Sequence, residues 1–379
     1  MRCEKISNFM IVALFLSFWT FGVSPAQASY PLFSQEIKAV ETLVQVGKYR
    51  LNFQVIEGGN LTILLEAGGG MDSREWNNLA PELARKTGAT IVSYDRAGFG
   101  KSDLPETPQD MREEVEWLWQ GLQKLNLYKD LILVGHSFGG WMIRLIASEH
   151  PEAVRGMVLV DPFTNEFVDL LGVEYLDNHP MTGKLPFDTS KPDKLTKFQR
   201  AVVRMVGDGL GPKIEIMRQT SIPSNIPVLV ITSGRPFLPK TEEQEAWRLS
   251  HEQLTASIKG AALIVAEESD HMIPMRQPAL IIEAVMKVIN KNSPVLKGPY
   301  LGQKQPGMTP EVFAPGIIST KNYDEALFCT YMDGDSLFLF TRSSPGASGQ
   351  IYYPIYIMGL KDGEWTIKPL SCPQTLHSC

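Results

Sequence analysis

Residues 130–150 read DLILVGHSFGGWMIRLIASEH and contain two secondary-structure patterns joined by a short glycine-rich turn. Residues 131–134 form a short, continuous apolar run, which is typical of a strand buried on both faces. From Trp141 onward the apolar residues recur at helical spacing. The sequence GHSFG, residues 135–139, therefore lies where a strand turns sharply into a helix. This context predicts a nucleophile elbow with an outward-facing serine, and it makes Ser137 the candidate nucleophile.

Apolar strands alternate with amphipathic helices through most of the chain. A hairpin over residues 42–57 precedes strands expected at 61–65, 89–94, 157–160, 226–232 and 262–266. Helices are expected at 79–86, 111–126, 241–258 and 278–291, and TEEQ at 241–244 is typical of a capping box. This order predicts an α/β fold with a mostly parallel sheet and helices on both faces. Active sites of such sheets collect at the carboxyl ends of the strands.

A serine nucleophile needs a general base, and the six histidines of the chain supply the candidates. His271 follows the last predicted strand and precedes the final helix, which is the place expected for the base in the chain order serine, acid, histidine. His136 adjoins the serine inside the elbow, where its ring would point away, so we expect a structural role. His251 falls in mid-helix and is expected to be exposed.

The acid that orients the base has several candidates. Asp161 ends the strand after the elbow helix, in MVLVDP, and could reach a histidine at a neighbouring strand end. The other common location, after the strand that precedes the base, offers no carboxylate before Glu242, Glu243 and Glu245. Asp161 is therefore the predicted acid, these glutamates remain the alternatives, and a structural role for Asp161 in its turn stays open.

Two backbone N–H groups must hold the oxyanion that forms during acyl transfer. One is that of Phe138, directly after the nucleophile. The other should come from the glycine-rich loop AGGG at residues 67–70, where Gly69 is the best candidate.

The alternating strands and helices lie in a predicted catalytic domain that follows a predicted signal peptide. Basic residues, an apolar run over 9–23 and an A-x-A site ending at Ala28 predict a cleaved signal peptide, residues 1–28, and a periplasmic or secreted protein with no stable membrane anchor. Residues 29–292 are the predicted catalytic domain. Residues 163–222 interrupt the strand–helix alternation and are too long for a plain loop, so a lid over the site is expected.

The motifs LLEAGGGMDSREW, SYDRAGFGKSD, LVGHSFGG, LVDP and SDHMI stand in an order and spacing that resemble the α/β-hydrolase superfamily. The resemblance covers roughly residues 60–290 and implies an esterase- or lipase-like serine hydrolase that needs no cofactor. Ala67-Gly68 stands where His-Gly is commoner. Related dehalogenases and epoxide hydrolases use an aspartate nucleophile, and Ser137 argues against both activities.

The C-terminal segment, residues 293–379, has a different character. β-rich runs separated by Asp-Gly turns resemble one blade of a TolB-like β-propeller. A single blade leaves uncovered edges, so a protein partner is one role and an inert appendage is another. Cys329, Cys372 and Cys379 all lie here, and export would permit one disulfide whose pairing the sequence leaves open.

Composition narrows the function. The net charge of −6 and the absence of basic runs argue against nucleic-acid binding, and no cysteine–histidine spacing resembles a metal site. We expect an exported hydrolase that cleaves a carboxylic ester or related acyl bond of a small-molecule substrate through an acyl-enzyme. A peptidase or a cofactor-free perhydrolase would use the same residues. A non-catalytic binding protein on a hydrolase scaffold is the alternative from another class.

Overall fold

The computed structural model describes residues 37–107, 110–179, 185, 187–207 and 209–292, together with six strands between residues 325 and 369. The predicted signal peptide lies outside these residues, as do Cys372 and Cys379. Among the residues that the structure describes, no helix combines the length and apolar character needed to cross a bilayer.

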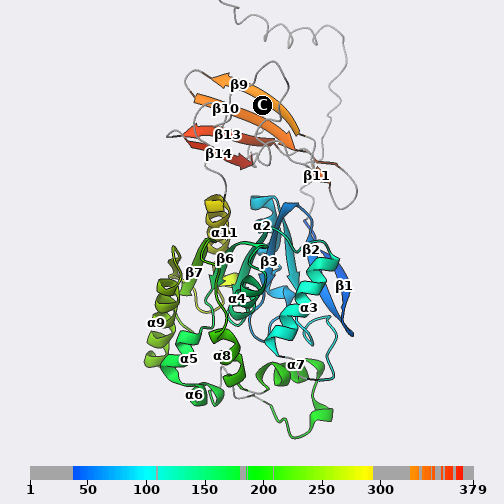
Figure 1. Ribbon diagram of the computed structural model, residues 1–379, viewed down its shortest axis with the longest axis vertical. Coiled ribbons are helices and arrows are strands. Elements are labelled where there is room, and N and C mark those ends of the chain that lie inside the picture. The colour runs from blue at the N-terminus through cyan, green and yellow to red at the C-terminus, as the bar shows by residue number, and fades with distance from the viewer. Residues whose placement is uncertain are drawn as a thin grey trace, which may run out of the picture. The chain divides into compact units, whose positions relative to one another are not determined.

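The main sheet has eight strands in the order β1-β2-β4-β3-β5-β6-β7-β8 (Figure 1). β1 pairs antiparallel with β2, and β2 pairs antiparallel with β4, whereas every other neighbouring pair is parallel. The strands are Val40–Val46 (β1), Tyr49–Ile56 (β2), Gly59–Glu66 (β3), Ala89–Tyr94 (β4), Leu131–His136 (β5), Val154–Val160 (β6), Val228–Ser233 (β7) and Ala262–Ala266 (β8). The prediction of a mostly parallel α/β sheet is confirmed.

Helices pack on both faces of this sheet because each presents an apolar stripe to the apolar strands. α2 (Ala80–Thr87) and α11 (Pro278–Asn292) contact each other and strands β4 and β6. α3 (Met111–Lys124) and α4 (Gly139–Glu149) contact each other, with α3 on β1 and α4 on β5. All six residues of β4, β5 and β7 are buried, as expected for strands covered on both faces.

The helix α9 (Thr241–Ser257) begins at the predicted residue, but its N-cap lies one residue earlier than the sequence pattern suggested. The predicted capping box placed the N-cap at Thr241 with Gln244 three residues later. In the structure the N-cap is Lys240, and its backbone N–H donates to the Glu243 side chain over 3.2 Å. The predicted N-cap is therefore wrong by one residue, because Glu243 rather than Gln244 reaches back to the start of the helix.

The insertion between β6 and β7 is helical and gathers at one end of the domain (Figure 1). Its described elements are α5 (Asn165–Leu171), α6 (Val173–Asp177), the 3-10 helix η2 (Pro192–Lys194), α7 (Lys197–Val206) and α8 (Gly211–Arg218). A second 3-10 helix, η1 (Ser73–Trp76), follows the glycine-rich loop after β3, and the short α10 (Ile273–Arg276) follows β8.

The C-terminal segment contains an antiparallel four-stranded sheet in the order β14-β13-β10-β9. Its strands are Glu325–Met332 (β9), Asp335–Arg342 (β10), Ile355–Lys361 (β13) and Glu364–Pro369 (β14), and a separate pair is formed by Ser344–Pro345 (β11) and Ile351–Tyr352 (β12). Cys329 lies in β9. The β-rich prediction agrees with these strands, and the resemblance to a propeller blade stays a prediction.

Candidate active site

Ser137 lies in a strained turn between β5 and α4. Its φ is +52°, in the left-handed region that non-glycine residues rarely adopt and that marks a serine elbow. The backbone on either side passes too close for side chains. A Cβ on Gly135 would lie 2.6 Å from the Gly139 carbonyl oxygen, and one on Gly139 would lie 2.5 Å from the Glu66 carbonyl oxygen. The two glycines of the motif are therefore required by close backbone approach, and Ser137 is left half-buried at the carboxyl end of the strand.

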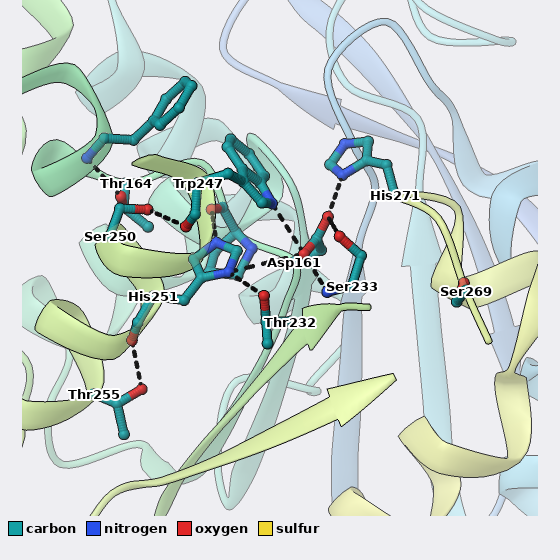
Figure 2. Close-up of polar contacts among 12 residues, drawn as sticks. Asp161, Thr164, Thr232, Ser233, Trp247, Ser250, His251, Thr255, Ser269 and His271 are labelled. Atoms are coloured by element: carbon teal, nitrogen blue, oxygen red, sulfur yellow. Dashed lines mark hydrogen bonds and ion pairs between the residues drawn. The ribbon is translucent and has the colours of Figure 1, made fainter. Parts of the chain in front are cut away.

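Asp161 and His271 are 110 residues apart in sequence and meet at the carboxyl end of the sheet. The His271 Nδ1 atom lies 2.6 Å from Asp161 Oδ2 (Figure 2). A carboxylate only accepts hydrogen bonds, so Nδ1 carries the proton and Nε2 of the neutral ring is the basic nitrogen. The structure thus brings together the predicted base and the predicted acid.

Asp161 is fully buried and receives donors on both carboxylate oxygens. Ser233 at the end of β7 donates its N–H to Oδ1 over 2.7 Å and its hydroxyl to Oδ2 over 3.0 Å. Trp247 of α9 donates its indole N–H to Oδ1 over 3.1 Å. Burial raises the pKa of Asp161, but the hydrogen bond and charge of His271 together with the Ser233 N–H hold that pKa below its usual value. The carboxylate is therefore a stable anion at neutral pH.

His251 does not have the exposed position that its place in mid-helix suggested. It is completely buried beside Asp161, with its Nδ1 atom 2.8 Å from the Thr232 hydroxyl and its Nε2 atom 2.8 Å from the Pro162 carbonyl oxygen (Figure 2). The prediction failed because the buried face of α9 includes polar side chains that lie beside the Asp161 carboxylate. Burial lowers the pKa of His251, so its ring is neutral and donates from Nε2 to the carbonyl oxygen.

His271 is packed between aromatic rings. Its ring centroid lies 4.3 Å from that of Phe237 and 5.6 Å from that of Trp247. Burial lowers the pKa of His271, which favours the neutral ring that a base requires. No hydrogen bond joins Ser137 Oγ to His271 Nε2 within the described residues. Such contacts are often long before a substrate binds and tighten in the complex.

The alternative acids do not reach His271. Glu242 and Glu245 are exposed on α9. Glu243 is buried, but its carboxylate contacts the Tyr175 hydroxyl and lies 3.4 Å from both His179 Nε2 and Lys240 Nζ. Asp270 beside the base accepts the Met272 N–H over 2.9 Å instead. Among these carboxylates and Asp161, only Asp161 is joined to the histidine.

The loop after β3 lies against the elbow. A Cβ on Gly69 would lie 3.4 Å from Phe138 Cβ, so the two predicted oxyanion donors belong to touching segments. Neither the Gly69 nor the Phe138 N–H donates a hydrogen bond within the described part of the chain. Two backbone donors beside the serine are thus available to a developing oxyanion.

Arg96, which follows β4, forms hydrogen bonds with this loop. Its guanidinium donates to Glu66 Oε1 over 2.6 Å, to the Ala67 carbonyl oxygen over 2.7 Å and to the Gly68 carbonyl oxygen. The C=O and N–H of a trans peptide point in opposite directions. By fixing the Gly68 carbonyl, Arg96 therefore fixes the direction of the Gly69 N–H.

Helix α7 of the insertion approaches the same loop. The thioether of Met205 lies within 3.8 Å of where a Gly69 Cβ would be, and Ala201 lies within 2.8 Å of the equivalent point on Gly98. Phe198 packs edge-on against Phe99 with 6.1 Å between ring centroids. The insertion predicted as a lid thus places an apolar side chain, Met205, next to the candidate oxyanion site.

Within the described ranges, no three His, Cys, Asp or Glu side chains group as a metal site.

Comparison with known proteins supports this assignment of the fold. The sequence model of the alpha/beta hydrolase fold matches residues 62–189, from β3 through the elbow and into the insertion. The chain has the alpha/beta hydrolase fold. The uncharacterised protein YqjL of Bacillus subtilis (strain 168) is 26% identical over 228 residues, which is 60% of this chain and 83% of that protein. A putative non-heme haloperoxidase of Mycobacterium phage D29 is 28% identical over 173 residues, 45% of this chain and 56% of the phage protein.

Solved structures agree at the level of the fold. A single-residue variant of the haloalkane dehalogenase DatA from Agrobacterium tumefaciens C58 superposes with a TM-score of 0.51 at 16% identity, covering 67% of this chain and 98% of that chain. At this identity the likeness carries the fold alone.

Sequence reasoning missed the residues that support the acid and the oxyanion loop. Ser233, Trp247 and His251 surround Asp161 and belong to no quoted motif. Arg96 lies in the motif SYDRAGFGKSD, but nothing in that motif indicated its contact with Gly68. Ser233 carried one usable signal, because it ends a buried strand next to the strand of Asp161.

Proposed function

We propose that the chain is a serine hydrolase that cleaves a carboxylic ester through an acyl-enzyme. The observation that carries this proposal is the 2.6 Å hydrogen bond from His271 Nδ1 to the buried anion of Asp161, at the same sheet edge as the strained Ser137. The alpha/beta hydrolase fold and the similar proteins support hydrolase activity. The ester as substrate is our inference from the site.

In the acylation step Ser137 Oγ attacks the ester carbonyl carbon while His271 Nε2 takes the hydroxyl proton. The carbonyl oxygen becomes an oxyanion and accepts hydrogen bonds from the Gly69 and Phe138 N–H groups. The carbon–oxygen bond to the alcohol then breaks, and His271 returns the proton to the leaving alcohol. In the second half water attacks the acyl-enzyme with His271 as base, which releases the carboxylic acid and restores Ser137.

Asp161 stabilises the imidazolium that forms in each half. Its anion is held by Ser233 and Trp247, so it does not need to take the proton itself. This arrangement lets His271 alternate between neutral and charged forms without losing its orientation.

A fluorophosphonate probe tests the proposal directly. The wild-type protein should be labelled at Ser137 and should hydrolyse members of a p-nitrophenyl ester series from acetate to long acyl chains. The Ser137→Ala variant should fold, escape labelling and lose activity by roughly three or more orders of magnitude. A wild-type protein that neither reacts with the probe nor hydrolyses any ester would favour the non-catalytic binding role.

Amide and peroxide chemistry are separated in the same assay. A peptidase would cleave aminoacyl p-nitroanilides faster than the matched esters. A perhydrolase would convert added hydrogen peroxide and a carboxylic acid to a peracid.

We also propose roles for the N-terminal residues 1–28 and for the C-terminal segment. Residues 1–28 direct export to the periplasm or the medium, and mass spectrometry of exported protein should find Ser29 as the new N-terminus. The C-terminal segment is a single propeller-like blade that contacts a protein partner. A truncation after Asn292 should keep ester hydrolysis, and a truncated protein that loses all activity would contradict the boundary.

A further inference from the structure

A second histidine–carboxylate pair lies next to the first, with 4.6 Å between the ring centroids of His136 and His271. His136 Nδ1 is 2.5 Å from Glu75 Oε1, and the two side chains are 2% and 0% exposed. His136 is the last residue of β5, and Glu75 lies in the 3-10 helix η1. The reaction steps proposed above use neither residue.

The remaining polar atoms of the pair contact the two segments that carry the chemistry. Glu75 Oε2 accepts the Gly68 N–H over 2.8 Å, next to the candidate oxyanion donor Gly69. His136 Nε2 lies 2.8 Å from the carbonyl oxygen of His271 itself. The pair therefore links the oxyanion loop, the elbow and the backbone of the base.

Donor and acceptor chemistry fixes the state of His136. The His271 carbonyl oxygen only accepts, so His136 Nε2 donates to it. Nδ1 lies at ion-pair distance from a carboxylate oxygen without hydrogen-bond geometry, and a proton on this nitrogen avoids placing its lone pair against the anion. His136 is therefore an imidazolium paired with a carboxylate. Burial lowers the pKa of His136, but the Glu75 carboxylate, the His271 carbonyl oxygen and the Asp161 charge together raise that pKa above its usual value.

Such a pair contributes little net stability, because the cost of removing two charges from water offsets their attraction. Its contacts instead constrain geometry. Together with Arg96 on the Gly68 carbonyl, Glu75 on the Gly68 N–H holds both sides of one residue in the oxyanion loop. The His136 ring also fills the space beside it, since a Cβ on Gly68 would lie 2.9 Å from His136 Nδ1.

We propose that Glu75 and His136 are positioning residues that set the oxyanion loop and the His271 segment in register with Ser137. This inference rests on the proposed function. A displacement of about 1 Å in such groups can cost a factor of about 100 in rate, so loss of the pair should lower kcat while substrate binding persists. Glu75 acts through Gly68, and His136 acts through the His271 backbone.

Three substitutions of Glu75 separate positioning from charge and from stability. Glu75→Gln keeps the length, and its amide can accept the Gly68 N–H and donate to Nδ1 of a neutral His136. Glu75→Asp keeps the charge but is one methylene too short to reach both partners. Glu75→Leu keeps the bulk and removes both contacts.

The measurements are kcat and KM on the best p-nitrophenyl ester and the inhibition constant of a trifluoromethyl ketone with the same acyl chain. This ketone binds as an oxyanion adduct of the serine, so its affinity reports the oxyanion site. We expect Glu75→Gln to retain kcat within about fivefold, and Glu75→Leu to lose about 100-fold in kcat and in ketone affinity with KM changed less than threefold. Glu75→Asp should be less active than Glu75→Gln.

The order of the two polar variants decides the outcome even if Glu75→Leu does not fold. Activity of Glu75→Asp equal to or above that of Glu75→Gln would overturn positioning and indicate a role for charge. Equal kcat and ketone affinity in all folded variants, checked by circular dichroism, would also overturn it. A wild-type protein that fails to react with the fluorophosphonate would refute the proposed function instead.

Discussion

Two histidine–carboxylate pairs lie side by side near Ser137, and they differ in what the second ring nitrogen does. The rings of His136 and His271 lie 4.6 Å apart between centroids. In the Asp161–His271 pair, Nε2 of the histidine makes no hydrogen bond within the described residues. In the Glu75–His136 pair, the corresponding nitrogen faces the His271 carbonyl oxygen. One ring is free to exchange a proton, and the other has both nitrogens occupied by fixed acceptors.

The carboxylates differ in the same sense. Asp161 is held as an anion by Ser233 and Trp247, independently of the histidine. Glu75 has the Gly68 N–H as its other partner, so its position follows the oxyanion loop. A histidine beside a carboxylate can act as a base only where the ring nitrogen that faces away from the carboxylate has no other partner. Burial lowers the pKa of His271, whereas for His136 the Glu75 carboxylate, with the His271 carbonyl oxygen and Asp161, raises the pKa despite burial.

The largest difference between the pairs should come from the same carboxylate-to-amide change in each. In Asp161→Asn the amide oxygen can replace Oδ1 and keep the Ser233 and Trp247 contacts, so an NH₂ group faces His271 Nδ1. That nitrogen must then accept, which moves the proton to Nε2 and removes the base. We expect kcat to fall by about 10⁴, against less than about fivefold for Glu75→Gln.

Steady-state kinetics on one ester and active-site titration with the fluorophosphonate measure this contrast. Glu245→Gln is the matched control, because it makes the same chemical change on the exposed side of α9 and should leave kcat unchanged. Near-full activity of Asp161→Asn, or a large loss in Glu245→Gln, would transfer the acid role away from Asp161.

The next largest effect concerns pH. His271 must be neutral to act, and burial lowers its pKa below the ordinary value of about 6.5. Activity should therefore be lost as the pH falls through a value below about 6.5, with kcat/KM decreasing about tenfold per unit on the acid side. Asp161, His136 and Glu75 are the titratable groups around this ring.

A pH profile of kcat/KM between pH 4 and 9 checks the sign. The profile should keep its acid midpoint in Glu242→Gln, which changes an exposed carboxylate of α9. A midpoint clearly above 6.5 in the wild-type protein would mean that the charged partners of His271 outweigh burial, and that the two histidines are less different than their contacts imply.

A smaller effect is expected at the boundary between the oxyanion loop and the insertion. Met205 of α7 touches the space around Gly69, so it should limit the acyl chains that fit. Met205→Ala removes this bulk and should raise the ratio of kcat/KM for a long ester over acetate by several-fold, because each accommodated methylene is worth about 0.8 kcal/mol at most.

Phe198→Ala is the control, since Phe198 lies on the same helix but packs against Phe99. A chain-length profile over p-nitrophenyl esters measures both variants. An unchanged profile in Met205→Ala, or an equal change in Phe198→Ala, would mean that α7 does not shape the acyl site.

Sequence reasoning predicted the fold well because the strands are continuous apolar runs and the helices are amphipathic. The spacing of apolar and polar residues within one segment is enough to predict such a strand or helix. The elbow was predicted for the same reason, since the glycines around Ser137 are required by close backbone contact. The structure also joins Asp161 to His271, as the strand-end argument expected, although their catalytic roles stay predictions.

What the sequence did not predict depends on contacts between distant elements. His251 was expected to be exposed because its helix reads as a surface helix, yet the surface it buries contains the Asp161 carboxylate. Glu75 and His136 lie 61 residues apart, as their numbers show, and no motif links them. Their pairing becomes visible only when η1 is placed beside the end of β5. The N-cap of α9 shifted by one residue because two carboxylate or amide side chains could each close the cap.

The smallest effect on activity is expected at Glu114 of α3, where the predicted change concerns stability. Burial raises the pKa of Glu114 on α3 to about 7. Because this folded-state value lies above the unfolded value of about 4.3, the folded protein binds the extra proton, and the associated stability is lost as the pH rises through about 7. Glu114→Gln removes that titration. Relative to wild type, the variant should gain about 2 to 3 kcal/mol between pH 5 and pH 8.5, measured by urea unfolding at both values. Glu113→Gln, on the exposed side of the same helix, should show no such pH-dependent gain. If the free energies of unfolding of Glu114→Gln and wild type differ by the same amount at both pH values, Glu114 is ionised throughout this range. The carboxylate of Glu114 would then be an anion at neutral pH, as Asp161 is.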